Sequence, residues 1–189
     1  MNDIQLLKGF MPKVTSDSYF EELMPLNWEQ PIIKIFGKSN PIPRKQLLFV
    51  DESVSKSYSY SGIKMETKLF DGVIKQIKIN VESNCKMSFN TALVNLYRNG
   101  NDCVGWHSDS ESLFVDFPIV VSLSLGSARY FHFRNKLDSK IKKKFLLENG
   151  DLLIMGSSIQ NEWQHAILKE PNVISPRINI TFRNVIKIK

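Results

Sequence analysis

The sequence predicts a mainly β fold with flanking helices, arranged as a β-sandwich or jelly roll. The part of the chain after Phe89 contains six short runs of β-branched or alternating residues, separated by turn-forming groups such as Asn149-Gly150-Asp151. Two segments have the apolar spacing of an amphipathic helix, and both lie before that part. Short strands at such intervals are typical of two packed sheets.

The expected elements follow the chain in order. Residues 18–27 form a short helix with Ser16 or Asp17 as its N-cap, and residues 71–85 form a second helix. Residues 32–36 are a β-branched strand, and residues 37–44 form a turn or loop. The later strands are expected at 92–97, 119–125, 129–134, 143–147, 152–155 and 177–182.

Composition narrows the class of protein. A chain of 189 residues fits one domain with a hydrophobic core, and its net charge of +6 suits a polyanionic partner as well as a generally lysine-rich chain. Cys85 and Cys103 are too few and too far apart for a disulfide framework or a cysteine zinc site. We find no signal peptide and no membrane span, so we expect an intracellular protein, in the cytoplasm or the nucleus.

The chain has three histidines, and one of them stands two residues before an aspartate. In extended backbone His107 and Asp109 point to the same side, so both can reach one metal ion. With His165 as third ligand they would form the facial triad of a non-haem iron site. A His-x-Asp pair alone has low specificity, and a surface histidine beside a solvated aspartate is the alternative. His132 has no such carboxylate, so we interpret it as structural or as part of a substrate groove.

The segment 177–183 could hold a carboxylate. It alternates strictly, with Arg177, Asn179, Thr181 and Arg183 on one face and apolar residues on the other. Arginine presents a planar fork that binds a carboxylate through two hydrogen bonds. The segment 94–97 repeats this pattern with a polar face formed by Asn95 and Tyr97. The alternative for both segments is an ordinary strand with its polar face in water.

These motifs resemble the AlkB dioxygenases, in the branch that contains the human AlkB homologues 2 and 3 and their bacterial relatives. The similarity runs from about Ile32 to Arg183, and several motifs keep their order and spacing. They are Phe36-Gly37-Lys38, Pro43-Arg44-Lys45-Gln46, Tyr58-Ser59-Tyr60-Ser61-Gly62, Asn95-Leu96-Tyr97-Arg98, Gly105-Trp106-His107-Ser108-Asp109, Ser122-Leu123-Ser124-Leu125-Gly126, Trp163-Gln164-His165 and the segment from Pro176 to Arg183.

The resemblance implies a fold, an activity and cofactors. The fold would be a double-stranded β-helix (jelly roll) in a single dioxygenase domain over residues 1–189. In that domain, 1–65 would be an N-terminal nucleotide-recognition region, and 66–189 the helix plus jelly-roll core. The enzyme would use Fe(2+), 2-oxoglutarate and O2 to demethylate bases of the 1-methyladenine and 3-methylcytosine type in methylated DNA or RNA, as alkylation damage repair. Formaldehyde, succinate and CO2 would be released, and we expect a monomer.

The resemblance also assigns residues to roles. His107, Asp109 and His165 would bind iron. Asn95, Tyr97, Arg177, Asn179, Thr181 and Arg183 would bind 2-oxoglutarate, with Arg177 on the far carboxylate and Arg183 near the carboxylate that also binds iron. The substrate-binding residues would be Phe36, Arg44, Tyr58, Tyr60 and Glu111.

Within the base pocket, Tyr60 would stack on the flipped base, and Tyr58 and Glu111 would lie at its polar edge. Phe36 matches the residue that wedges into the base stack in duplex-repairing relatives, and Arg44 would lie near the nucleic-acid backbone. Ser110 departs from the family, which often has an acidic residue after the iron-binding aspartate. This departure leaves the preferred base open.

Other functions remain open at this stage. One is an oxygenase that acts mainly on RNA, or on protein or lipid. Another is a non-catalytic nucleic-acid-binding module with a relic metal site. The basic stretch between Arg134 and Lys144 either follows a phosphate backbone or forms a solvated hairpin.

Overall fold

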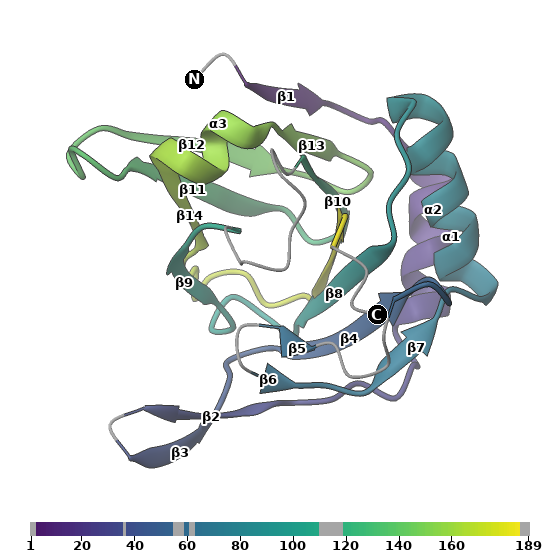
Figure 1. The fold of residues 1–189 in the computed structure, drawn as a ribbon, viewed down its shortest axis with the longest axis horizontal. Coiled ribbons are helices and arrows are strands. Elements are labelled where there is room, and N and C mark those ends of the chain that lie inside the picture. Colours follow the sequence, from purple (N-terminus) through teal and green to yellow (C-terminus); the bar gives the residue numbers. More distant parts are fainter. Residues whose placement is uncertain (1–2, 36, 55–58, 61–62, 110–118, 186–189) are drawn as a thin grey trace.

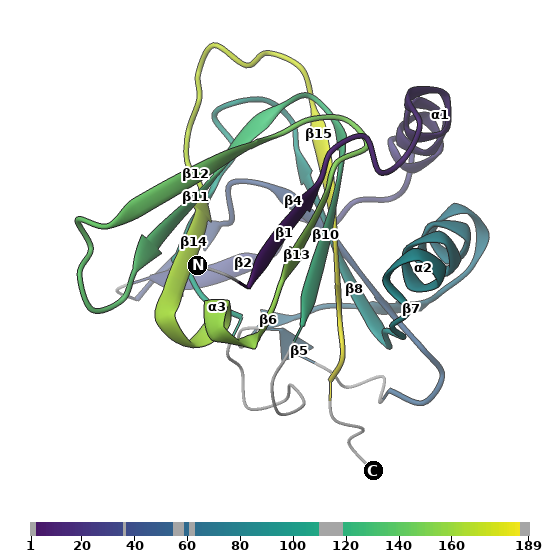
Figure 2. The same ribbon diagram turned by 90° about the horizontal axis from the view of Figure 1, so that it is seen from above.

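The chain folds into three layers. A computed structural model describes residues 3–35, 37–54, 59–60, 63–109 and 119–185, with the backbone alone at 35, 59, 60, 63 and 64. A large sheet lies in the middle, two helices cover one of its faces, and a small sheet packs against the other (Figures 1 and 2). Within these ranges no helix is long and apolar enough to cross a membrane.

The large sheet has seven strands. Neighbouring strands are antiparallel except for β4 and β7, which are parallel. In spatial order the strands are β1 (Ile4–Leu7), β13 (Leu152–Met155), β10 (Val120–Gly126), β15 (Arg177–Arg183), β8 (Thr91–Tyr97), β4 (Lys45–Val50) and β7 (Thr67–Leu69).

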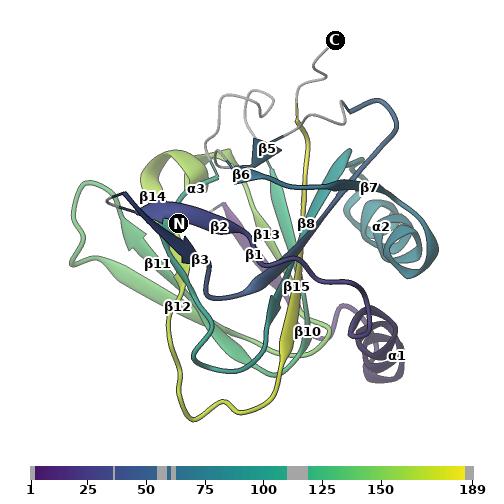
Figure 3. The same ribbon diagram turned by 90° about the horizontal axis from the view of Figure 1, so that it is seen from below.

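The small sheet has four antiparallel strands. In spatial order they are β12 (Lys142–Leu147), β11 (Arg129–Asn135), β14 (Trp163–Ile167) and β9 (Val104–His107). Two further hairpins are formed by β2 (Ile32–Ile35) with β3 (Lys38–Pro41) and by β5 (Ser59–Tyr60) with β6 (Ile63–Lys64). The β2–β3 hairpin lies on the side of the molecule away from the two long helices (Figures 1 and 3).

The helices are α1 (Lys13–Leu23), α2 (Gly72–Cys85) and the short α3 (Ser157–Glu162). Leu23 from α1 and Ile77 from α2 pack into one core cluster with Val94 of β8, Leu123 of β10 and Ile180 of β15. Burial of such apolar side chains stabilises the fold by about 1.5–3 kcal/mol each. The helices therefore occupy the apolar face of the large sheet.

The space between the two sheets has an apolar and a polar part. Phe131 and Phe133 of β11 pack against Leu153 of β13, with Ile159 and Trp163 beside them. The rest of the inner face of the large sheet carries the polar residues of β15 and β8, and most of these line a cavity. The architecture thus buries a strip of polar side chains between the two sheets. This polar strip consists of Asn95 and Tyr97 of β8 and of Arg177, Asn179, Thr181 and Arg183 of β15.

The predicted class, mainly β with flanking helices in a jelly roll, is confirmed, but the first helix was placed wrongly. It spans Lys13–Leu23 instead of 18–27 and follows Pro12. Ser16 lies inside it, where its hydroxyl donates to the carbonyl of Lys13 and accepts from Asn149. Pro25 has no N–H to continue the helix, which explains its early end. The second helix was predicted correctly, with Asp71 at its N-cap.

Several strands were missed. Residues 37–44 were expected as a loop, but Lys38–Pro41 pairs with β2, and Gly37 supplies the turn with a φ of 77°. His165 lies within β14, a strand that was not among the predicted ones. The division at residue 65 stays a prediction, although β1 and β4, which precede it, pair into the large sheet.

Candidate active site

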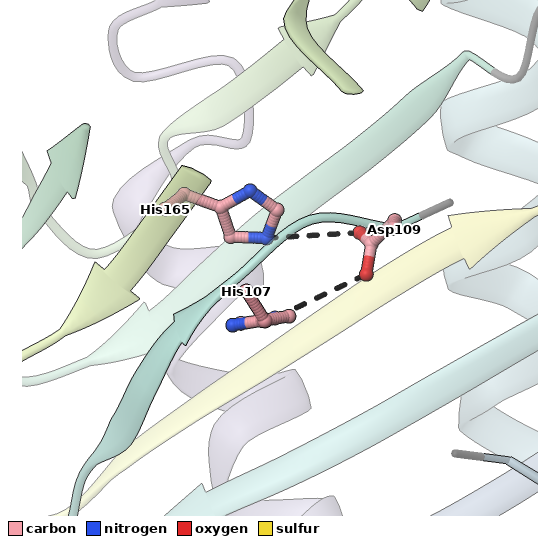
Figure 4. Close-up of side chains that lie close together, drawn as sticks. All are labelled: His107, Asp109 and His165. Carbon is pink, nitrogen blue, oxygen red and sulfur yellow. Dashed lines mark ion pairs between the residues drawn. The ribbon is translucent and has the colours of Figure 1, made fainter. Parts of the chain in front are cut away.

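Three side chains, carried by two adjacent strands and the residues directly after one of them, point toward one another (Figure 4). His107 ends β9, Asp109 follows it, and His165 pairs directly opposite His107 in β14. The Nε2 atoms of His107 and His165 lie 3.9 and 3.8 Å from the carboxylate oxygens of Asp109. One ligand atom from each residue lies within 4.8 Å of the other two. Two imidazoles and one carboxylate at this spacing can bind one divalent metal ion.

Neighbouring groups orient these ligands. The Nδ1 atom of His107 lies 2.8 Å from the carbonyl oxygen of Gly105, which leaves Nε2 directed toward Asp109. Gln160 of α3 accepts a hydrogen bond of 2.9 Å from the backbone N–H of Asp109. The Nη2 atom of Arg183 lies 3.1 Å from both carboxylate oxygens of Asp109. This carboxylate, only 2 % exposed, thus has an arginine as its ion-pair partner.

His165 is suited to metal binding by its environment. Its side chain is 3 % exposed, and burial, followed by the neighbouring His107, lowers the pKa of His165 to about 3. Its imidazole is therefore neutral at physiological pH. A neutral imidazole has a free lone pair, which a metal ligand requires.

The polar strip borders a cavity of about 400 Å³ that also reaches the three ligands. Five of the six residues expected to bind 2-oxoglutarate line it: Asn95, Tyr97, Asn179, Thr181 and Arg183. Pairing of β15 with β8 sets Asn179 opposite Asn95 and Arg177 opposite Tyr97. All seven residues of each strand are buried, so their polar faces do not lie in water.

Arg177 does not line the cavity and lies against Tyr97. Its guanidinium carbon is 5.4 Å from the centre of the Tyr97 ring, and Nη2 donates to the hydroxyl of Ser124 at 2.9 Å. The side chain is 1 % exposed, and Nε and Nη1 have no acceptor among the described residues. Burial lowers the pKa of Arg177 to about 10, so the group stays charged at neutral pH.

Several residues that support this strip were not among the predicted site residues. Ser122 accepts a 2.6 Å hydrogen bond from the Asn179 amide, and Gln46 of β4 lies 2.8 Å from the Asn95 side-chain oxygen. Gln160 was also missed. Each is a common polar residue in an otherwise ordinary strand or helix, and only the strand pairing reveals its partner.

The expected base pocket is described in part. Phe36, Tyr58, Glu111 and Ser110 lie outside the described residues, and for Tyr60 the backbone alone is described, in β5. Arg44 borders the cavity, where its Nε donates to the Asn95 side-chain oxygen at 3.0 Å. The substrate roles of these residues stay predictions.

His132 lies on the other face of the small sheet from the buried Phe131 and Phe133. Its ring is 6.5 Å from Trp106 and 6.1 Å from Tyr130. It does not belong to the metal-ligand cluster, as the sequence predicted.

The chain resembles known proteins over most of its length. The model of the 2OG-Fe(II) oxygenase superfamily matches residues 3–183. The alpha-ketoglutarate-dependent dioxygenase alkB homolog 3 of Bos taurus is 36 % identical over 190 residues, which cover 95 % of this chain and 65 % of that protein. The human alkB homolog 3 is 40 % identical over 137 residues, or 68 % of this chain and 48 % of that protein.

Two further comparisons concern a second homologue and the fold. The DNA oxidative demethylase ALKBH2 of Mus musculus is 30 % identical over 194 residues, which cover 94 % of this chain and 78 % of that protein. The solved structure of OsALKBH1 superposes with a TM-score of 0.66 at 20 % identity, covering 96 % of this chain and 98 % of that one, and supports the jelly-roll fold. The chain spans about half to two thirds of the alkB homolog 3 proteins named above. It belongs to the AlkB group of the 2OG-Fe(II) oxygenase superfamily.

Proposed function

We propose that the protein is an iron(II)- and 2-oxoglutarate-dependent dioxygenase that removes methyl groups from nucleic-acid bases. The observation that carries this proposal is the convergence of His107, Asp109 and His165 on a cavity that buried polar residues of β8 and β15 also line. Because the chain belongs to the 2OG-Fe(II) oxygenase superfamily, we expect these three residues to hold the iron of that reaction.

The three ligands fit iron(II) by their chemistry. Two neutral imidazoles and a carboxylate on one side of a metal leave further coordination positions open for other molecules. The depressed pKa of His165 keeps that imidazole in the neutral form that binds a metal, and Arg183 pairs with the carboxylate of Asp109. His107 is oriented by the Gly105 carbonyl.

The polar strip fits a dicarboxylate. Arg177 offers two buried N–H groups that lack acceptors among the described residues, and burying unsatisfied donors costs about 1–3 kcal/mol each. A carboxylate supplies those acceptors and compensates the charge. Because Arg177 lies behind Tyr97, we propose that the tyrosine and the arginine together receive the far carboxylate, while Asn95, Asn179 and Thr181 line the path toward the metal.

Together, iron(II), 2-oxoglutarate and O2 would supply the oxidising chemistry, with succinate, CO2 and formaldehyde as products. The contribution of the chain is positioning and exclusion of water. Arg183 holds Asp109, Gln160 fixes the backbone before it, and the buried strands enclose the reacting groups. Such preorganisation lowers the cost of reaching the reactive geometry.

The outer face of the small sheet supports a nucleic-acid substrate. Lys144 lies 4.1 Å from the centre of the Tyr130 ring, and Arg134 lies 4.5 Å from that of Trp106. Lys142, which pairs with Arg134 and shares a face of β12 with Lys144, extends this basic surface. Cations next to aromatic rings suit a partner that presents both phosphates and bases. One of the relatives above carries the name DNA oxidative demethylase, which agrees with this assignment.

We propose bases of the 1-methyladenine and 3-methylcytosine type as substrates. Methylation at these positions makes the base cationic and prevents Watson–Crick pairing, so the damaged base is easier to flip out. The ring of Tyr60 and the negative charge of Glu111 would both favour a cationic base over a neutral one. Phe36 would replace the flipped base in the stack.

The proposal is tested with methylated DNA and RNA oligonucleotides, single- and double-stranded, in the presence of iron(II), 2-oxoglutarate and O2. Mass spectrometry of the oligonucleotide should show loss of one methyl group, with an equal amount of succinate. Turnover on RNA alone would identify an RNA-directed enzyme. Binding of oligonucleotide with no succinate above the level without oligonucleotide would identify a binding module and refute the demethylase.

A further inference from the structure

Tyr97 links the cavity to a second arginine that the expected cosubstrate site does not include. The tyrosine lines the cavity, and its ring centre lies 5.4 Å from the guanidinium carbon of Arg177 and 5.7 Å from that of Arg129. Both distances fall within the range of a cation–π contact. The tyrosine side chain is therefore in contact with two guanidinium groups, neither of which lines the cavity.

Arg129 is held rigidly. It is 0 % exposed, and its donors reach three backbone carbonyls, those of Asn99, Asp102 and Leu168, at 3.2, 3.1 and 2.7 Å. Its Nε donates to Glu170 at 3.1 Å. The arginine thereby joins the loop that follows β8 to the segment that follows β14, directly behind Tyr97.

Glu170 is the carboxylate that balances this arginine. Its Oε1 atom accepts from Arg129 and from the backbone N–H of Tyr130 at 3.0 Å. Its own backbone N–H donates to the carbonyl of Gly100 at 2.8 Å. Two guanidinium groups thus contact the ring of Tyr97, and the carboxylate of Glu170 pairs with one of them, Arg129.

Arg177 responds to both charges. After burial, which lowers its pKa most, Tyr97 raises that pKa, Arg129 lowers it and Glu170 raises it. The two arginines and the glutamate therefore act on each other through a poorly solvated region, where charges interact more strongly than in water.

We propose that Arg129 and Glu170 form a positioning pair that holds Tyr97 and sets the electrostatic potential at the end of the site where the far carboxylate of 2-oxoglutarate binds. The inference rests on the proposed function, because it assigns residues to the cosubstrate site of that reaction. Arg129 adds attraction for the carboxylate, and Glu170 reduces it while stabilising the fold.

This arrangement predicts opposite effects for the two partners. Glu170→Gln keeps an oxygen that accepts from Arg129 and Tyr130 but removes the negative charge. The variant should bind 2-oxoglutarate roughly threefold more tightly and melt at a lower temperature, because attraction for the carboxylate rises while two buried cations lose their counter-charge. Arg129→Gln should bind it roughly tenfold more weakly.

Arg129→Lys keeps the positive charge but loses the planar guanidinium group and its set of hydrogen bonds. It should bind 2-oxoglutarate more tightly than Arg129→Gln, which separates the effect of charge from that of packing. Glu148→Gln is the matched control, because that carboxylate pairs with Lys8 at an exposed position and is absent from the cavity lining. Its affinity for 2-oxoglutarate should equal that of the wild type.

The measurement is calorimetric titration of 2-oxoglutarate into the full chain loaded with Mn(2+) in the absence of O2, together with the melting temperature of each variant. Tighter binding with a lower melting temperature in Glu170→Gln supports the inference. Weaker or unchanged binding in that folded variant overturns it, and so does equal binding by Arg129→Gln and the wild type. If the wild type itself does not bind 2-oxoglutarate, the proposed function fails as well.

Discussion

The chemistry of individual residues here depends on charges that the fold keeps away from water. Asp109, Arg177 and Arg183 are each at most 5 % exposed; the two arginines lie on β15 of the large sheet, and Asp109 follows β9 of the small sheet. Burying a charge is costly unless a partner compensates it. Arg183 has its partner in Asp109, whereas Arg177 relies on a tyrosine ring and a serine hydroxyl.

Replacing Arg177 should affect cosubstrate binding before anything else. In Arg177→Met the buried carboxylate of 2-oxoglutarate loses a charged donor, so its Kd should rise by roughly 10- to 100-fold. Calorimetry on the Mn(2+)-loaded protein measures this change. Arg134→Met, on the outer face, is the control and should leave the Kd unchanged. An unaltered Kd in Arg177→Met would remove this arginine from the site.

The types of ligand could be predicted from single residues, but their surroundings could not. The spacing of His107 and Asp109 predicted a pair of metal ligands, because side chains two residues apart point to the same side of an extended backbone. The strand with Arg177 and Arg183 has the same alternation whether its polar face meets water or a second sheet. Only the packing of β9 and β14 over that face decides between them.

At the scale of elements, turns and strand pairing bring distant residues together. Gly150 makes the turn between β12 and β13 with a φ of 84°, and a Cβ there would lie 2.3 Å from the carbonyl oxygen of Met11. That carbonyl belongs to backbone that cannot move aside easily. The turn therefore requires glycine, both for its conformation and for the close approach.

Gly150→Ala should lower the free energy of unfolding by about 2–4 kcal/mol, because it combines a left-handed backbone with a steric clash. Urea denaturation measures this loss. Gly105→Ala is the comparison, since a Cβ at that position meets nothing within 4 Å. Equal stability of the two variants would show that the turn tolerates a side chain.

The β11–β12 hairpin is the element that should determine nucleic-acid affinity. Replacing both Arg134 and Lys144 with Gln removes two charges next to aromatic rings, so oligonucleotide affinity should fall by roughly tenfold at moderate salt, and its salt dependence should become less steep. Fluorescence anisotropy at several salt concentrations measures both effects. Binding of 2-oxoglutarate should not change.

For that double variant, an unchanged affinity and salt slope would mean that nucleic acid does not cross this face. A loss of 2-oxoglutarate binding as well would point to a damaged fold, which the melting temperature reveals.

Strands were predictable where alternation and turns were both clear. The strand 152–155 was predicted with its observed bounds, and the strand predicted at 92–97 differs from the observed one only by starting one residue later. Both predictions were close because the apolar runs there end at glycine or asparagine turns. β9 contains Gly105 and is only half-buried, and β14 mixes Trp, Gln and His, so neither has a recognisable period. Those two strands carry the histidine ligands.

At the scale of the whole molecule, the two faces of the large sheet have different roles, one in stability and one in chemistry. Its helix-covered face holds the main apolar cluster, and its other face holds the polar residues that line the cavity. The sequence shows this division in strand 177–183, where apolar and polar residues alternate, but the order of strands in the sheet comes only from the structure. Stability and chemistry therefore depend on opposite faces of the same strands.

The central claim is that His107, Asp109 and His165 together bind one metal ion. Titration of the metal-free protein with Mn(2+) in the presence of 2-oxoglutarate should give one ion per chain. In Asp109→Ala the Kd should rise more than about 100-fold, because a direct ligand is lost. His132→Ala, which changes the third histidine, should bind like the wild type. Equally tight metal binding by Asp109→Ala and the wild type would contradict the account.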